Sequence, residues 1–135
     1  MNISMIGAGY VGLVSAACFS EFGWTVTCVD KDPSKIEQLR RGRVPIYEPR
    51  LDELLQRNLG MGRIAFATEL SQSVGEADLV FLAVGTPMRR GDGHADLSFV
   101  FQAAEELAPH LNGFTVIATK STVPVGTSRE IERRL

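Results

Sequence analysis

The chain has 135 residues, of which 44% are hydrophobic, and its formal net charge is −2 at pH 7. This length suits one domain with a real core, and the small net charge offers no electrostatic basis for binding nucleic acid or an anionic membrane. No apolar run is long enough to cross a bilayer, and the apolar N-terminus runs into glycines rather than forming a signal peptide. Two cysteines without a secretory signal predict reduced thiols and a cytoplasmic protein.

The first thirty residues carry the strongest pattern in the chain. Residues 2–6 are a short apolar run, the motif Gly-Ala-Gly-Tyr-Val-Gly follows at residues 7–12, and residues 13–22 are again mostly apolar. A second apolar run over residues 25–29 ends on Asp30. The order of strand, G-x-G-x-x-G, helix, strand and acid is the pattern of a dinucleotide-binding βαβ unit.

Each residue type in this pattern has a physical reason. Gly7 lets the chain turn sharply off the strand, Gly9 lets a pyrophosphate approach the backbone, and Gly12 lets the helix pack closely on the sheet. The helix start presents free N–H groups and the positive end of the helix dipole to phosphates. Asp30, about 20 residues further on, suits hydrogen bonds from a ribose diol and would repel a 2′-phosphate. The pattern predicts NAD rather than NADP, and the alternative is a glycine-rich turn that serves only helix–strand packing.

Strands and helices alternate along the whole chain. We expect strands at residues 2–6, 25–30, 63–67, 78–84 and 114–119. We expect helices at residues 10–23, 33–42, 51–59, 68–74, 97–111 and 125–135. Asp32 and Pro33 are typical of an N-cap and a first helical residue, and two prolines exclude regular helix over residues 44–49. The alternation predicts an α/β fold, a doubly wound parallel sheet of Rossmann type with three αβα layers, in one domain over residues 1–135.

Polar segments follow three of the expected strands. They are residues 7–12 after the first strand, residues 85–87 after the fourth and residues 120–122 after the fifth. Ligands of an open parallel sheet bind beyond the carboxyl ends of its strands. We therefore expect these three segments to meet on one rim of the sheet.

With these segments assembled, the chain resembles the N-terminal domain of the UDP-glucose 6-dehydrogenase family, which includes GDP-mannose and UDP-N-acetylmannosamine dehydrogenases. The matching stretches are residues 7–13, residues 29–30 followed by 35–36, residues 45–49, and residues 84–87 together with 120–127. The resemblance covers essentially the whole chain, and its proline-bearing stretches are more specific than the glycine motif. Arg50 departs from the family pattern, which often has glycine after Glu-Pro.

The resemblance implies NAD as the cofactor and a role for each matched residue. Val11 would lie against the cofactor, with Asp30 and Lys35 at the adenosine ribose. Thr86 would contact the cofactor beyond the fourth strand. Thr122 would lie near the nicotinamide and the catalytic water, which makes it the candidate catalytic residue. The candidate cofactor-binding residues are Gly7, Gly9, Tyr10, Val11, Gly12, Asp30, Lys35, Gly85, Thr86, Pro87, Ser121 and Thr122.

Local alternatives stay open at several of these positions. Val11 lies on the same helical stripe as Val14, which suits core packing equally well. Lys35 is also typical of a solvated helix, and Thr86 of a turn before proline. Thr122 could begin a helix, and a neighbouring residue could share its proposed role.

The activity that the resemblance implies is oxidation of UDP-glucose to UDP-glucuronate with two NAD, through a thiohemiacetal on a cysteine. Cys18 falls on the inward stripe of the first helix and Cys28 in an apolar strand, whereas a nucleophilic thiol needs exposure and a nearby base. The family's catalytic cysteine would lie beyond residue 135. We therefore expect residues 1–135 to be a fragment of a longer dehydrogenase that binds NAD, is inactive alone, and forms homo-oligomers only with the missing C-terminal part.

Other functions remain as alternatives. They are a GDP-mannose or UDP-N-acetylmannosamine 6-dehydrogenase domain, a stand-alone non-catalytic NAD-binding module, and a dehydrogenase of hydroxy acids or hydroxyacyl thioesters, which the segment at residues 45–49 disfavours. A metal is not expected, because glycines and a helix cap account for Asp92, His94 and Asp96 sharing one loop. The expected partners are NAD and, in the full-length enzyme, a UDP-sugar, without nucleic acid or membrane.

Overall fold

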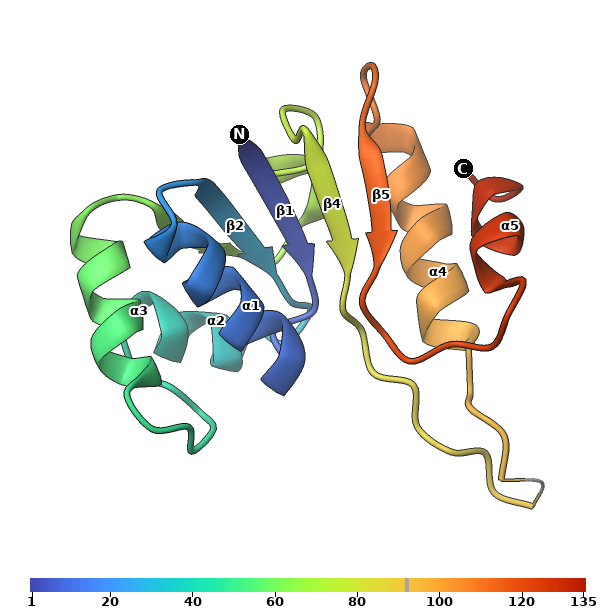
Figure 1. Cartoon of the computed structure of the whole chain (residues 1–135), viewed down its shortest axis with the longest axis horizontal. Helices are drawn as coiled ribbons and strands as arrows, with labels where there is room; N and C mark the ends of the chain where they lie inside the picture. Colours follow the sequence, from blue (N-terminus) through green and yellow to red (C-terminus); the bar gives the residue numbers. More distant parts are fainter. Residues whose placement is uncertain (92) are drawn as a thin grey trace.

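The computed structural model describes residues 1–91 and 93–135. Within these residues, five parallel strands form one sheet in the order β3-β2-β1-β4-β5 (Figure 1). The strands are β1 (Asn2–Ile6), β2 (Thr25–Val29), β3 (Ile64–Ala67), β4 (Leu79–Leu82) and β5 (Val116–Thr119). The helices are α1 (Tyr10–Glu21), α2 (Pro33–Arg40), α3 (Leu51–Gly60), α4 (Ser98–Leu107) and α5 (Thr127–Glu132), with 3₁₀ turns η1 (Leu70–Gln72) and η2 (Ala108–His110).

The order of the strands reverses beside β1. The chain moves outward from β1 to β2 and β3, and then returns so that β4 pairs with the other side of β1. In this register Ile6, the last residue of β1, lies opposite both Val29 and Leu82, the last residues of β2 and β4. The three strands therefore end level with one another, and the loops that follow them gather at the lower rim in Figure 1. This confirms the doubly wound parallel fold expected from the sequence.

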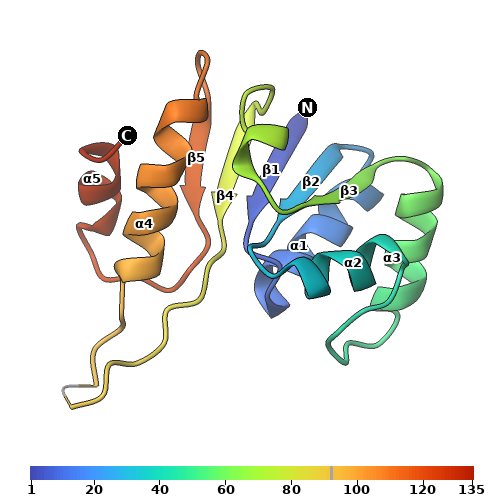
Figure 2. The same ribbon diagram turned by 180° about the vertical axis from the view of Figure 1, so that it is seen from behind.

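Side chains of the strands alternate between two buried faces. On β1, Ile3 and Met5 pack into a core with residues of α1, α2 and α3, whereas Ile6 packs into a second core with residues of α4 and α5. α1 lies in front of the sheet in Figure 1, and α4 lies in front of it in the reverse view of Figure 2. A parallel sheet that is buried on both faces requires this alternation of apolar side chains.

One expectation about β4 holds only in part. Its apolar run predicts helices over both faces, yet Leu79 and Phe81 are only half-buried. The ribbons of β4 and β5 face the viewer in Figure 1 without a helix in front of them. Phe81 packs sideways instead, because its ring stacks on that of Phe19 in α1 with the ring centres 5.2 Å apart.

Most element boundaries fall close to those expected. The side chain of Asp32 accepts hydrogen bonds from the backbone N–H groups of Ser34 and Lys35, which confirms it as the N-cap of α2. The helix expected from Thr68 onward was wrong, since the segment makes only the 3₁₀ turn Leu70–Gln72. The last helix is shorter than expected, because it begins after Gly126, whose φ is 94°.

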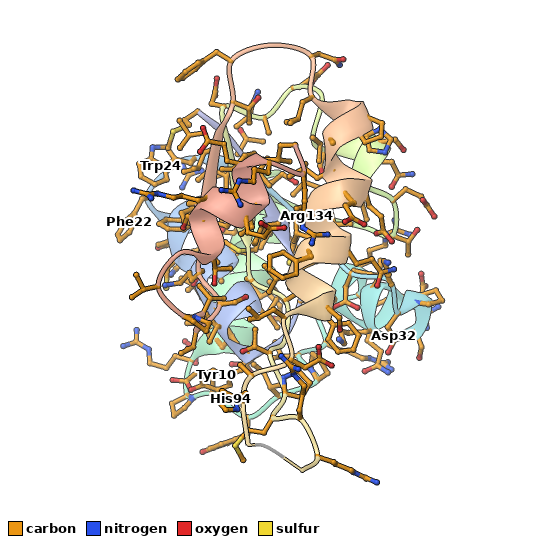
Figure 3. All side chains as sticks on the ribbon, turned by 90° about the vertical axis from the view of Figure 1, so that its right-hand side faces the viewer. Tyr10, Phe22, Trp24, Asp32, His94 and Arg134 are labelled. Atoms are coloured by element: carbon orange, nitrogen blue, oxygen red, sulfur yellow. The ribbon has the colours of Figure 1, made fainter. Side chains whose placement is uncertain are left out.

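The last helix is attached to the molecule through α4. The guanidinium of Arg134 lies 4.3 Å from the centre of the Phe101 ring on α4, in the middle of the view in Figure 3. Arg134 also pairs with Glu105 of α4. A cation above an aromatic face and an ion pair thus act together at this contact.

Two glycines decide how closely α1 approaches the sheet. Gly7 has a φ of 105°, and a Cβ built there would lie 2.7 Å from the carbonyl oxygen of Ala83. A Cβ built on Gly12 would lie 1.9 Å from the carbonyl oxygen of Gly7. A Cβ on Gly9 would meet nothing within 4 Å, so this glycine leaves open space at the rim. The steric roles expected of Gly7 and Gly12 agree with this geometry, and the role of Gly9 at a pyrophosphate stays a prediction.

We expect Gly12→Ala to lower the free energy of unfolding by about 3 kcal/mol, because the backbone oxygen of Gly7 cannot move aside without shifting α1. Urea unfolding followed by circular dichroism measures this change. Gly60→Ala is the matched control, since Gly60 also lies in a helix and its Cβ would meet nothing within 4 Å. Equal losses in the two variants would contradict the steric account.

Candidate functional site

A crevice of about 910 Å³ lies at the rim where β1, β2 and β4 end. Its first wall contains Gly7 and Gly9 after β1, Asp30 after β2, and Gly85 and Pro87 after β4. The volume lies within the range typical of small-molecule and cofactor sites. The structure thus brings residues from three strand ends together, as the topology predicts.

The loop at residues 7–12, called the glycine loop below, turns the start of α1 toward this crevice. Gly9 is the N-cap of α1, has extended backbone angles (φ −75°, ψ −174°), and no side chain caps the helix there. The first N–H groups of a helix have no partner within the helix, and the helix dipole adds partial positive charge at the same end. This arrangement suits the binding of a phosphate group.

Asp30 points back at the glycine loop. One of its carboxylate oxygens accepts hydrogen bonds from the Ala8 N–H at 2.8 Å and from Lys35 Nζ at 3.0 Å, and the other accepts one from the Asp32 N–H at 3.0 Å. Partial burial alone would raise the pKa of Asp30, but the N–H groups of Asp32 and Ala8 and the Lys35 ammonium outweigh it and lower the pKa. A stable anion therefore lies at the end of β2, next to the glycine loop.

The other wall of the crevice comes from α4 and η2. Phe99, Gln102, Glu106 and His110 line it, and they follow one another at the spacing of a helical stripe. The sequence interpretation considered only the apolar stripe of this helix, which faces the core, and missed these residues. Their helical spacing, which forms a second stripe beside the apolar one, is the sequence signal that could have identified them.

Tyr10 and Val11 occupy the first turn of α1 and are both about half exposed. Val11 is 48% exposed, so the alternative that it packs in the core was wrong. The hydroxyl of Tyr10 donates a hydrogen bond to the carboxylate of Glu48, and this bond raises the pKa of Tyr10. Tyr10 lies low in Figure 3, toward the carboxyl ends of the strands. Its hydrogen bond to Glu48 connects the proline-bearing segment, residues 45–49, to the start of α1.

The remaining candidates lie toward β5. Thr86 is half-buried between Gly85 and Pro87, and Thr122 is exposed after the end of β5. The hydroxyl of Ser121 donates a 2.6 Å hydrogen bond to the carbonyl oxygen of Val84, which joins the segments that follow β4 and β5. Ser121 therefore has a structural contact of its own, whereas Thr122 is an exposed residue.

The two cysteines differ in their surroundings, and both are free thiols. Burial, followed by the nearby charge of Asp30, raises the pKa of Cys28 to about 12. Cys18 is only half-buried and lines a separate cavity of about 270 Å³ with residues such as Pro49 and Arg57. The expected burial is confirmed for Cys28 and holds only in part for Cys18.

Asp92 lies outside the described residues, and Asp96 of the same loop accepts a 3.0 Å hydrogen bond from the backbone N–H of Ser98 at the start of α4. Within residues 1–91 and 93–135, no three His, Cys, Asp or Glu side chains are grouped so that they could hold a metal ion. Among the helices of this described part, none has the length and apolar character needed to span a membrane.

The switch in strand order, the glycine loop at a helix start and the acid at the end of the neighbouring strand define a dinucleotide-binding Rossmann domain. Residues 1–135 match the family described as the UDP-glucose/GDP-mannose dehydrogenase family, NAD binding domain. The chain belongs to this family, and its cofactor is NAD.

Named relatives and solved structures agree with this family. The chain is 60% identical over 133 residues to UDP-glucose 6-dehydrogenase of Rhizobium meliloti, covering 98% of this chain and 30% of the relative. The crystal structure of a ternary complex of GDP-mannose dehydrogenase from Pseudomonas aeruginosa matches with a TM-score of 0.92 at 34% identity, over 97% of this chain and 30% of that one. A UDP-glucose dehydrogenase from Pyrobaculum islandicum matches with a TM-score of 0.91 at 40% identity, over 98% and 32%. The chain thus spans about 30% of the length of the first of these relatives.

We expect Asp30→Asn to flatten the acid dependence of stability. The pKa of Asp30 is lower in the folded chain than the ordinary value of about 3.9, so the carboxylate stabilises the fold above that value and this contribution is lost as the pH falls through the folded-state pKa. Urea unfolding of both proteins from about pH 5 to about pH 2 checks this. Wild type should lose stability more steeply than the variant, and parallel curves would contradict the assignment.

Proposed function

We propose that residues 1–135 act as the NAD-binding part of a longer dehydrogenase that oxidises UDP-glucose to UDP-glucuronate with two NAD. The contact of the Asp30 carboxylate with the Ala8 N–H supports the cofactor site, because it places the acid beside the phosphate-binding loop. The choice of UDP-glucose is supported by 60%, 49% and 48% identity to three relatives named UDP-glucose 6-dehydrogenase.

The fold alone does not favour one sugar nucleotide. The TM-scores are 0.92 for the GDP-mannose dehydrogenase, 0.91 for the UDP-glucose dehydrogenase and 0.92 for a UDP-N-acetylmannosamine-type dehydrogenase from Pyrococcus horikoshii. The identities to these three are 34%, 40% and 27%. Sequence identity is therefore the observation that favours UDP-glucose over the two alternatives.

In this proposal, residues that line the crevice and residues beside it contact different parts of the cofactor. The N–H groups at the start of α1 bind the diphosphate, and Asp30, supported by Lys35, accepts hydrogen bonds from the adenosine ribose. Gly85, Thr86 and Pro87 continue the site toward the exposed hydroxyl of Thr122, which would orient a water molecule. When bound, the nicotinamide supplies the hydride acceptor for oxidation of the alcohol.

The thiol chemistry must come from another part of the enzyme. Oxidation past the aldehyde requires an accessible thiolate that forms a thiohemiacetal. Cys28 is buried with a pKa of about 12, and Cys18 lines the separate cavity beside α3. We therefore place the nucleophile outside residues 1–135. A cytoplasmic location stays a prediction from the free thiols.

Calorimetric titration of the 135-residue chain with NAD and NADP tests the cofactor site. We expect NAD to bind more tightly than NADP, and Asp30→Ala to weaken NAD binding by at least about tenfold, since two hydrogen bonds to a charged group are lost on the ribose. Asp52→Ala, an exposed acid in the first turn of α3, is the control and should leave both affinities unchanged. Equal affinities in wild type, or full NAD affinity in Asp30→Ala, would contradict the role of this carboxylate.

A chimera tests the reaction. Residues 1–135 replace the matched segment of the Rhizobium meliloti UDP-glucose 6-dehydrogenase, and NAD reduction is measured with UDP-glucose. We expect turnover by the chimera and none by the isolated chain. Thr122→Val should lower kcat at least about tenfold with little change in the KM for NAD, whereas Thr122→Ser keeps the hydroxyl and the rate.

Two results would overturn this proposal in different ways. A chimera that binds NAD without turnover would favour a non-catalytic NAD-binding module. Full activity of Thr122→Val in an active chimera would remove the catalytic role of Thr122 alone.

A further inference from the structure

A second ion pair joins the two walls of the crevice. The ammonium of Lys31, the residue directly after Asp30, lies 2.6 Å from a carboxylate oxygen of Glu106 on α4. Both residues line the crevice, and they come from opposite walls. The pair thus joins the end of β2 to a helix that the glycine motif does not include.

The position of Lys31 conflicts with NAD preference when the residue is considered alone. Cofactor sites for NADP use a cation near the end of the second strand to bind the 2′-phosphate. Two lysines, Lys31 and Lys35, stand close to Asp30 along the chain, and only Lys35 pairs with Asp30, at 3.0 Å. Without a partner of its own, Lys31 would attract a 2′-phosphate and oppose the repulsion that Asp30 exerts.

Glu106 is held in position to neutralise Lys31. The same carboxylate oxygen accepts a 2.8 Å hydrogen bond from Gln102, one turn earlier in α4. The side chain of Glu106 is 37% exposed and that of Lys31 is 69% exposed, so the lysine reaches toward a more buried anion. The hydrogen bond from Lys31, helped by that from Gln102, also lowers the pKa of Glu106, which therefore stays ionised at neutral pH.

We propose that Glu106 is a second specificity residue for the cofactor: it neutralises Lys31 and, together with Asp30, excludes the 2′-phosphate of NADP. This inference rests on the proposed NAD site but adds a residue from the opposite wall. Glu69 lines the same crevice and adds a further carboxylate. Both walls of the crevice then contribute to discrimination against NADP, because Asp30 at the end of β2 is followed directly by Lys31, whose charge must be neutralised.

The test compares Kd values for NADP and NAD in calorimetric titrations of the 135-residue chain. We expect Glu106→Gln to tighten NADP binding about three- to tenfold, since an exposed lysine is freed to meet the phosphate, and to change NAD binding by no more than about twofold. Added salt should reduce the gain, because it depends on charge. The double variant Lys31→Gln, Glu106→Gln should return to the NADP affinity of wild type.

Glu105→Gln is the matched control. Glu105 neighbours Glu106 in α4 and also forms an ion pair, but its partner is Arg134 after α5. We expect no change in either Kd, and melting curves of all variants verify that they are folded. An unchanged NADP-to-NAD ratio in Glu106→Gln, an equal shift in Glu105→Gln, or a gain that persists in the double variant would each overturn the inference while leaving NAD binding intact. A wild-type chain that binds neither dinucleotide would overturn the proposed cofactor site and this inference together.

Discussion

The close approach of α1 to the sheet is the constraint on which the other features depend. The carbonyl oxygen of Gly7 occupies the space that any side chain at residue 12 would need, and Gly7 itself fits only because its own side chain is absent. This contact brings the start of α1 to the edge of the sheet instead of above its face. The free N–H groups of the helix and the end of β2 are then close enough for Asp30 to bond with Ala8.

The cofactor site is built from charge as much as from shape. A helix start that favours anions lies beside a carboxylate, and the two can coexist because the N–H groups and Lys35 around Asp30 stabilise its ionised form. The diphosphate and the ribose diol of a dinucleotide need these opposite environments a few ångströms apart. The Lys31–Glu106 pair extends the same logic to the far wall, where one more cation is matched by one more anion.

The surroundings of the two thiols do not suit a nucleophilic role. Cys28 is buried in β2, and this burial destabilises the thiolate and so raises the pKa of the thiol. Leu79 and Phe81 are only half-buried, so one face of β4 is less covered than the same face of the neighbouring β1. The β5 side of the sheet is therefore covered less fully than its centre.

Much of this molecule was determined by local sequence. The glycine motif, the acid after the second strand and the Asp32 cap each specify short-range geometry, so the fold class, the glycine loop and the position of Asp30 could be predicted. Only the tertiary structure decided the opposite wall, the exposure of Val11 and Cys18, and the pairing of Lys31 with a carboxylate 75 residues away. Such contacts depend on how far α4 and α3 pack from the sheet, and no local pattern of residues encodes that distance.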